Sequence, residues 1–219
     1  LFICAMMQNT HDTIIALATG IGRSSIAIIR LSGSDSISLV NRSFNGKDLT
    51  SAAGNTIHLG NIYNEGQILD QVLVSVFRTP HSYTGENSIE ISCHANPLII
   101  DNIITVLLKH GARLAGPGEF TFRSFMNGKM SLAQAESVAE LISTKSSQGL
   151  KNSLRQLNGE LNNKLDRLKE EIIEIRSLLE ALLDFPEEED VANISEDKIG
   201  NRLESLESEI KRLSDSYNQ

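Results

Sequence analysis

The chain has 219 residues, of which 40% are hydrophobic and 22% are charged, as in ordinary globular proteins that can bury a core. Aromatic residues make up only 5% and Trp is absent, which argues against a surface that stacks on sugars or nucleic-acid bases. Residues 146–219 hold ten Lys and Arg against 17 Asp and Glu, so they carry a net −7 of the total −8. Neither half is therefore a basic surface that would bind nucleic acid by itself.

The two cysteines, Cys4 and Cys93, are too few for a disulfide framework and lack the spacing of metal ligands. They favour a reducing compartment, and we expect a cytoplasmic protein. The apolar start, Leu1–Met7, is too short to span a bilayer, and no signal-peptide cleavage pattern follows it. We expect no membrane association, and Met7 is the more natural first residue.

Between residues 13 and 94, five short runs rich in β-branched residues predict strands. They cover residues 13–19, 25–33, 55–63, 71–77 and 87–94. Two stretches with helical periodicity, 34–44 and 96–112, accompany these runs. Strands with two interspersed helices predict an α+β domain, either a mixed sheet with the helices packed on one face or a split βαβ sandwich.

The segment GPGEFTFRSFMNGKMSLAQAES, residues 116–137, carries the signals of two consecutive helices. Its opening Gly-Pro-Gly predicts a turn, and Glu119–Met126 predicts a short helix with a cluster of three Phe residues. Gly128 is suited to cap the C-terminus of that helix. Ser131 with Gln134 predicts a capping box for the next one.

Asn127-Gly128-Lys129 therefore lies at a corner between two helices. A lysine near a helix N-terminus opposes the helix dipole, whereas a bound anion would attract both the free N–H groups and the ammonium. The corner is thus a candidate anion site. It is not a P-loop, because G-x-x-x-x-G-K-[ST] would need Gly at Arg123 and Ser or Thr at Met130. The chain contains no nucleotide-hydrolysing motif.

The second half of the chain is helical in pattern. Leu and Ile residues recur every three or four positions from Leu150 to Leu182 and predict one long helix. Pro186, in the acidic segment 184–190, ends it. Asn193–Tyr217 gives a second apolar stripe, so we expect an antiparallel hairpin. The apolar seam of this hairpin is narrow, and the other faces of both helices are charged. We expect the hairpin to pack on further chain or on a partner. We also expect the protein to continue beyond this sequence.

Arg30 and Glu90 are candidate site residues on two of the expected strands. Arg30 ends an apolar strand, a position that is more often exposed than functional. Glu90 alternates with Ile89 and Ile91 and so faces the other side of the sheet. If that side lines a cleft, its carboxylate is suited to accept paired N–H groups of a pterin or guanine-like ring. From residue types alone, Arg30, Glu90 and Lys129 are a possible carboxylate-binding set.

Two other motifs favour ordinary structural roles. Gly20–Ser25 could cradle a phosphate, but a strand rather than a helix follows it, so a plain turn is favoured. Cys93 and His94 are more typical of packing residues than of a catalytic pair, because no neighbouring group in the sequence would orient the histidine. We assign no catalytic residue.

Five stretches in one order resemble the tRNA-modification GTPase family MnmE, also called TrmE. They are DTIIALAT (12–19), IIRLSG (28–33), SYTGENSIEISCH (82–94), GPGEFTFRSFMNGKMSLAQAE (116–136) and LLDFPEEE (182–189). The fourth stretch is highly specific. The resemblance implies a folate-binding, aminomethyltransferase-like domain at residues 1–125, and the first part of a helical domain at 126–219. It also implies that the family's GTP-binding domain follows this chain.

The same resemblance implies the function. Members of this family act with an FAD-dependent partner of the MnmG type to form the carboxymethylaminomethyl group on the wobble uridine of certain tRNAs. They bind 5-formyltetrahydrofolate or a related tetrahydrofolate, hydrolyse GTP with Mg²⁺ and K⁺, and dimerise through the N-terminal domain. The folate-contacting residues of the family's motifs correspond here to Arg30, Glu90 and Lys129. The present chain alone, without a P-loop, should not hydrolyse GTP.

The chain departs from the family pattern at several glycines. Ser24, Ser25 and Ala27 stand in a usually Gly-rich stretch, Ala95 stands in place of a glycine after His94, and Gly116 replaces a frequent arginine. If those glycines allow close approach to the ligand, the affinity is lower here. Two alternatives stay open: a stand-alone folate-dependent one-carbon transferase, and a structural dimerisation module with a vestigial pocket.

Overall fold

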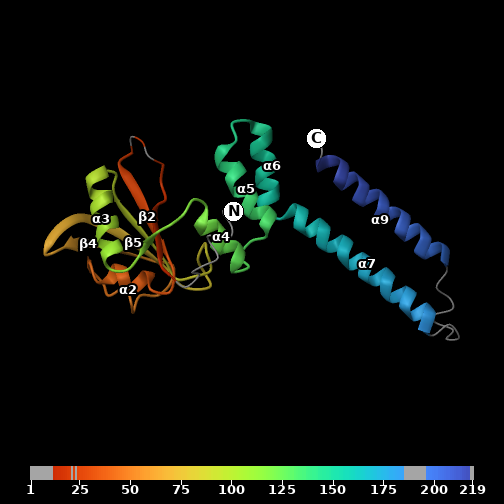
Figure 1. Cartoon of the computed structure of the whole chain (residues 1–219), viewed down its shortest axis with the longest axis horizontal. Helices are drawn as coiled ribbons and strands as arrows, with labels where there is room; N and C mark the ends of the chain where they lie inside the picture. The colour runs from red at the N-terminus through yellow and green to blue at the C-terminus, as the bar shows by residue number, and fades with distance from the viewer. Residues whose placement is uncertain (1–11, 21, 23, 185–195, 218–219) are drawn as a thin grey trace. The chain divides into compact units, whose positions relative to one another are not determined.

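The computed structural model describes residues 12–20, 22, 24–184 and 196–217 (Figure 1). The chain forms two compact units, Leu1–Thr144 and Lys145–Gln219. Within the described ranges, no helix is both long enough and apolar enough to cross a membrane. The two units are built differently, and each is described by itself.

The described strands of the first unit form one seven-stranded sheet, in the order β3-β4-β5-β6-β2-β1-β7. The strands are β1 (Ile14–Leu17), β2 (Ile26–Ser32), β3 (Phe44–Asn45), β4 (Thr56–Asn64), β5 (Gln67–Phe77), β6 (Ser88–His94) and β7 (Arg113–Leu114). Neighbours are antiparallel except β1 and β7, which are parallel. All five strands expected from the sequence are confirmed. The two additional strands, β3 and β7, have only two residues each.

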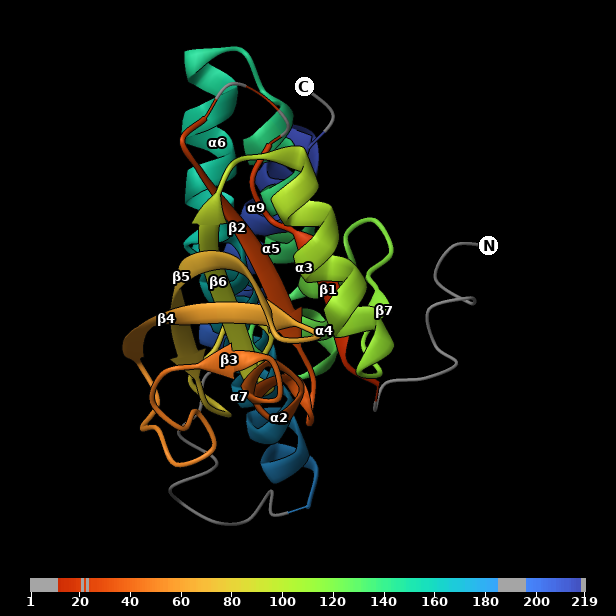
Figure 2. The same cartoon turned by 90° about the vertical axis from the view of Figure 1, so that its left-hand side faces the viewer.

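One face of the sheet carries the hydrophobic core. Helix α2 (Ser36–Asn41) and helix α3 (Pro97–Lys109) pack on it, as expected from the sequence. In α3, Asn96 is the N-cap and Pro97 the first helical residue, a favoured start for a helix. Alternate strand residues face these helices and are fully buried: Ile29, Leu31, Val74, Val76, Ile89 and Ile91. Figure 2 shows α3 running along the sheet in nearly the same direction as β2. The fold class, α+β with a mixed sheet, is confirmed.

Helix α4 (Glu119–Met126) lies on the other side of β2 from α3 (Figure 1). It has the predicted bounds, and Gly118 before it has φ +73°, a conformation that favours glycine. The C-cap is Asn127, with Gly128 one residue further at φ +67°, so Gly128 ends the helix from the position just beyond the cap. Helix α5 (Leu132–Ser143) begins with the predicted Ser131–Gln134 capping box.

The second unit contains α6 (Ser147–Leu157), α7 (Glu160–Asp184) and α9 (Glu196–Tyr217). The expectation of one helix through Leu150–Leu182 is wrong, because the helix breaks at Asn158 and Gly159. Gly159 has φ +78°, which a continuous α-helix cannot contain. The spacing of the Leu and Ile residues continues across Asn158 and Gly159, so this periodicity could not predict the break.

The predicted antiparallel hairpin between α7 and α9 is confirmed. Arg167 pairs with Glu209 and Glu174 pairs with Arg202, so the two helices run in opposite directions. Four buried side chains form the seam between them: Leu168, Ile175, Ile199 and Leu206. The acidic segment around Pro186 lies outside the described residues.

Candidate functional site

Arg30 and Glu90 are direct neighbours on β2 and β6, paired in the antiparallel register. Both side chains lie on the sheet face opposite the core, because strand residues alternate between faces. The Nε of Arg30 donates to Oε1 of Glu90 at 2.8 Å, and Nη2 lies 2.7 Å from the same oxygen. The side chains are 27% and 24% exposed. Arg30 is therefore half-buried and paired, unlike a typical charged residue at a strand end.

Two aromatic rings flank the Arg30 guanidinium. Its Cζ lies 5.2 Å from the ring centroid of Tyr83 and 5.7 Å from that of Phe120. Such distances allow cation–π attraction. Tyr83 belongs to the loop before β6 and Phe120 to α4, so the rings come from two separate segments. The hydroxyl of Tyr83 hydrogen-bonds to Thr121 at 2.9 Å, which connects those segments directly.

The loop of residues 79–87 is held in place by α4 and the residue after it. Ser124 donates to the carbonyl of Tyr83 at 2.7 Å, and Asn127 donates to the carbonyl of Thr84 at 2.8 Å. Both bonds satisfy loop carbonyls that no strand partner reaches. They hold the backbone of the loop against α4 and Asn127, and they thereby fix the position of the Tyr83 ring.

Lys129 contacts the same loop. Its Nζ donates to the carbonyl of Pro80 at 3.0 Å, at an exposed position. Its stem passes close to Gly85, where an added Cβ would lie 3.1 Å from Cγ of Lys129. Gly85 also has φ +80°, so a side chain there would be strained as well as crowded. The loop thus connects Lys129 to the Tyr83 ring that flanks Arg30.

A hollow of about 520 Å³ adjoins this loop. It is lined by Ser34, Thr79, Pro80, Gly85, Glu86, Asn87 and Asn127. Two of these residues, Pro80 and Gly85, are the ones that Lys129 contacts. The lining does not include Arg30 or Glu90. The structure therefore brings Arg30 and Glu90 into contact, whereas Lys129 lies apart from them and contacts two residues that line this hollow.

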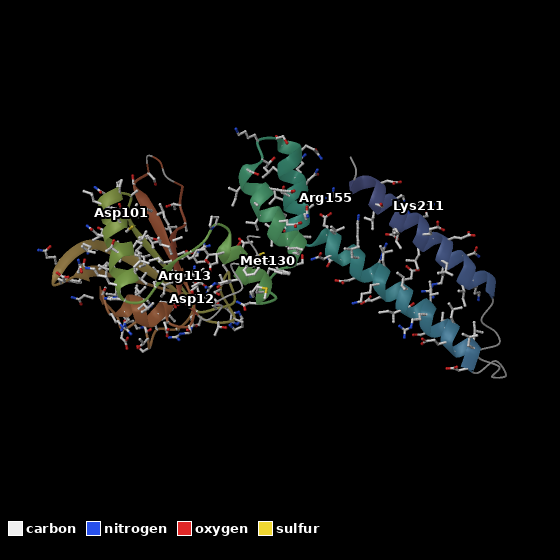
Figure 3. All side chains as sticks on the ribbon, viewed as in Figure 1. Asp12, Asp101, Arg113, Met130, Arg155 and Lys211 are labelled. Carbon is white, nitrogen blue, oxygen red and sulfur yellow. The ribbon has the colours of Figure 1, made fainter. Side chains whose placement is uncertain are left out.

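A buried ionic network supports α4. Arg123 is 3% exposed and donates to Asp12 at 2.5 Å, to Glu119 at 3.1 Å and to Glu86 at 3.3 Å. Arg113 donates to Asp12 and to Glu119, each at 2.7 Å. Figure 3 labels Asp12 and Arg113, which lie close together. The network joins the segment before β1, the loop 79–87, β7 and α4, and so holds the walls of the site together.

This network shifts the protonation of its carboxylates. Burial acts to raise the pKa of Asp12, but hydrogen bonds from Arg113 and Arg123 outweigh it, so the pKa is lowered. Burial likewise acts to raise the pKa of Glu119. Hydrogen bonds from Arg113, the Gly116 N–H and Arg123 outweigh this effect, so the pKa of Glu119 is also lowered. Both groups are therefore held as carboxylates. Apart from the i,i+4 spacing of Glu119 and Arg123, nothing in the sequence signals this network.

His94 is oriented by Asp70, contrary to the expectation that no group would do so. Its Nδ1 lies 2.8 Å from Oδ1 of Asp70, and its backbone N–H donates to Oδ2 at 2.8 Å. Asp70 lies on β5, the neighbouring strand, which sequence proximity could not reveal. Burial, and secondarily the charge of Asp70, raises the pKa of Cys93 to about 11. Cys93 is thus a protonated packing residue. No group of three or more His, Cys, Asp or Glu side chains that could hold a metal occurs among the residues described.

The fold is that of an α+β domain with a mixed seven-stranded sheet, followed by an all-helical region. Residues 13–129 match the family described as GTP-binding protein TrmE N-terminus, and residues 132–219 match the MnmE helical domain. The chain therefore belongs to the MnmE (TrmE) family. The matches change family model between residues 129 and 132, and the compact units divide after Thr144. The predicted domain boundary after residue 125 stays a prediction.

Relatives named tRNA modification GTPase MnmE agree with this assignment. The chain is 46% identical over 210 residues to that of Flavobacterium psychrophilum, covering 94% of the chain and 45% of the relative. It is 42% identical over 213 residues to that of Christiangramia forsetii, covering 96% and 45%. It is 38% identical over 210 residues to that of Bacillus thuringiensis strain Al Hakam, covering 95% and 46%. The chain thus spans a little under half the length of these relatives.

Proposed function

We propose that this chain is the tetrahydrofolate-binding and dimerising part of a tRNA-modifying GTPase. The observation that carries the proposal is the position of Glu90. Its carboxylate lies on a half-buried sheet face and accepts two N–H donors from one planar group, the Arg30 guanidinium, which two aromatic rings flank. The amino-pyrimidine edge of a tetrahydrofolate presents two such donors side by side.

The two cations of the site suit the remaining parts of that ligand. Arg30 and Lys129 would meet its polar or anionic groups, and the present contacts of Lys129 leave it exposed to do so. When bound, the folate would supply the one-carbon unit for the modification. The residues of this chain would bind and orient it, and they hold no group that we assign to the chemistry itself.

The outer face of the sheet supports dimerisation with a second copy of the chain. It carries three exposed apolar side chains on the adjacent strands β4 and β5 and a fourth on β2, beyond β6: Ile57, Leu59, Leu73 and Ile26, 45–65% exposed. Leu59 and Leu73 are register partners, so the apolar surface is continuous across β4 and β5. A contiguous exposed apolar surface of this kind is typical of an interaction site. A Leu73→Asp variant should shift sedimentation towards monomer, while Leu98→Asp, a change at a 73% exposed position of α3, should not.

The activity of the whole protein is part of the same proposal. It would hydrolyse GTP with Mg²⁺ and K⁺, act in the cytoplasm with an FAD-dependent MnmG-type partner, and modify the wobble uridine of tRNA. The sequence given contains no P-loop, so none of its residues is assigned to GTP or to these ions. The proposal for the present chain is restricted to folate binding and dimerisation.

Calorimetric titration with 5-formyltetrahydrofolate tests the binding. Saturable binding by the parent chain, weakened at least about tenfold by Glu90→Gln and by Lys129→Ala, is expected from the loss of a charge-assisted hydrogen bond. Lys109→Ala, an exposed lysine of α3, is the matched control and should bind like the parent. A folded parent chain that does not bind this folate contradicts the proposal and leaves a scaffold domain.

A further inference from the structure

The guanidinium of Arg30 makes the contacts that the proposed function requires of the ligand ring. It donates two N–H groups to Glu90 and lies over the rings of Tyr83 and Phe120. A guanidinium and a 2-amino-pyrimidinone share the same planar unit, a carbon carrying an amino group next to a ring or chain N–H. Arg30 therefore carries the same pair of adjacent N–H donors as a pterin edge, although both of its donors approach one oxygen of Glu90.

The two groups cannot use these contacts together. Both Arg30 donors converge on Oε1 of Glu90, and in the described part of the chain no donor reaches Oε2. A pterin edge that donates in parallel to both oxygens needs the place that the guanidinium fills. The side chains of this pair are 27% and 24% exposed, so solvent reaches them. A ligand that brings its own donors to Glu90 can replace the guanidinium without leaving the carboxylate unpaired.

We propose that Tyr83 and Phe120 are specificity-determining residues, which with Glu90 form a slot for a planar guanidine-like edge, and that Arg30 is the internal competitor for this slot. On this view the ring of the ligand displaces the guanidinium from Glu90, and Arg30 then turns to the anionic part of the same ligand. This inference rests on the proposed folate function and adds to it the residues that select the ring.

The slot is held ready for a ligand by contacts that Arg30 does not make. The loop carbonyl of Tyr83 accepts from Ser124, and its hydroxyl bonds Thr121. Phe120 follows Glu119, which is 5% exposed and fixed by Arg113 and Arg123. The rings would therefore keep their places when the guanidinium leaves, and a preorganised slot loses little entropy on binding.

Arg30→Ala gives the sharpest test, with two ligands compared by calorimetry on the complete chain. The first, 6-methyltetrahydropterin, has the ring without an anionic tail; the second, 5-formyltetrahydrofolate, has both. Removal of the competitor should tighten the ring-only ligand several-fold and weaken the folate relative to it. If the ring-only ligand binds Arg30→Ala no better than the parent chain, Arg30 is not a competitor and the inference is overturned.

Tyr83→Leu tests the slot itself. Loss of the ring should weaken both ligands by about tenfold, the usual scale of one base-on-aromatic contact. Tyr83→Phe and Thr121→Val remove only the hydroxyl contact and keep the ring, so both should bind within about twofold of the parent chain. Equal binding by Tyr83→Leu and Tyr83→Phe, in folded proteins, would overturn the assignment of Tyr83.

The side-chain Nε–H signal of Arg30 in nuclear magnetic resonance gives a readout independent of affinity. The signal is identified as the one lost in Arg30→Lys. It should shift on addition of 6-methyltetrahydropterin, as the bond to Glu90 is exchanged, and a signal unchanged at saturation would contradict displacement. A parent chain that binds neither ligand, with Arg30→Ala equally inactive, would overturn the folate function itself. If the parent chain binds the ligands and Tyr83→Leu binds them equally well, the folate function stands and only the present inference is overturned.

Discussion

The two units of the chain are stabilised in opposite ways. In the first unit, charged groups are buried together around Arg123, and the apolar core lies between one sheet face and two helices. In the second unit, four apolar residues form a narrow seam, and the ion pairs beside it lie at the surface. The first unit contains the candidate site, whose side chains must be held in defined positions. Its buried polar network positions these side chains in addition to stabilising the fold.

The largest expected effect comes from removing the centre of that network. Arg123→Met removes the cation that contacts Asp12, Glu86 and Glu119 together, and leaves Arg113 alone to pair with Asp12 and Glu119. Breaking a buried ionic cluster in this way costs about 3–5 kcal/mol. Urea denaturation should show this loss. Arg155→Met is the matched change in the second unit, where the partner Glu160 is exposed, and should cost about 0–1 kcal/mol. Equal effects of the two substitutions would remove the contrast between the units.

The next effect is on the seam of the second unit. Leu168 is 4% exposed between α7 and α9, and its truncation in Leu168→Ala should cost about 2–4 kcal/mol through lost burial and a residual cavity. Hydrogen exchange of peptides from α7 and α9 should accelerate while sheet peptides keep their protection. Leu183→Ala, at an 81% exposed position, serves as control and should leave exchange unchanged.

Low pH should destabilise the first unit through Asp12 and Glu119. Their folded-state pKa values lie below the ordinary values of 3.8 and 4.5, so the folded state releases these protons more readily than the unfolded chain. Their contribution is complete above those ordinary values and is lost as the pH falls through the lowered ones. Urea midpoints measured from pH 6 downwards should drop near pH 4 and below, and Asp12→Asn should reduce the slope. A midpoint independent of pH in this window would be contrary to the network described.

The smallest effect concerns a surface pair on α7. Arg176 and Glu180 are spaced i,i+4 and are 74% and 56% exposed. Arg176→Ala should therefore cost no more than about 0.5 kcal/mol, and added salt should remove even that difference. Thermal denaturation at low and high ionic strength checks both statements. A loss comparable with that of Arg123→Met would show that surface charge stabilises the second unit after all.

Much of the fold was predictable because local patterns determine it. The five longer strands follow from apolar runs, and α4 and the capping box of α5 follow from turn and cap residues. The two-residue strands β3 and β7 could not be predicted, since they exist only through their partners. The break at Gly159 was hidden because the apolar stripe continues through it.

The site was predictable only in part, because its contacts join distant positions. Arg30 and Glu90 could be singled out separately, but their pairing depends on the register of β2 with β6. The flanking rings of Tyr83 and Phe120 are equally invisible in one sequence, as is the contact between Asp70 and His94. The ligand itself stays a prediction from family resemblance.

The parallel pairing of β1 with β7 has a consequence for synthesis of the chain. Ile14 is made early, but its partner Arg113 leaves the ribosome only after all the other strands of the sheet. The edge of the sheet can therefore form only when this unit is nearly complete, and the same holds for α4, which contributes the Phe120 ring to the site. A nascent chain that has not reached Lys129 lacks a wall of the site. Any stabilisation by a ligand can then act only on a finished unit, so binding distinguishes completed chains from truncated ones.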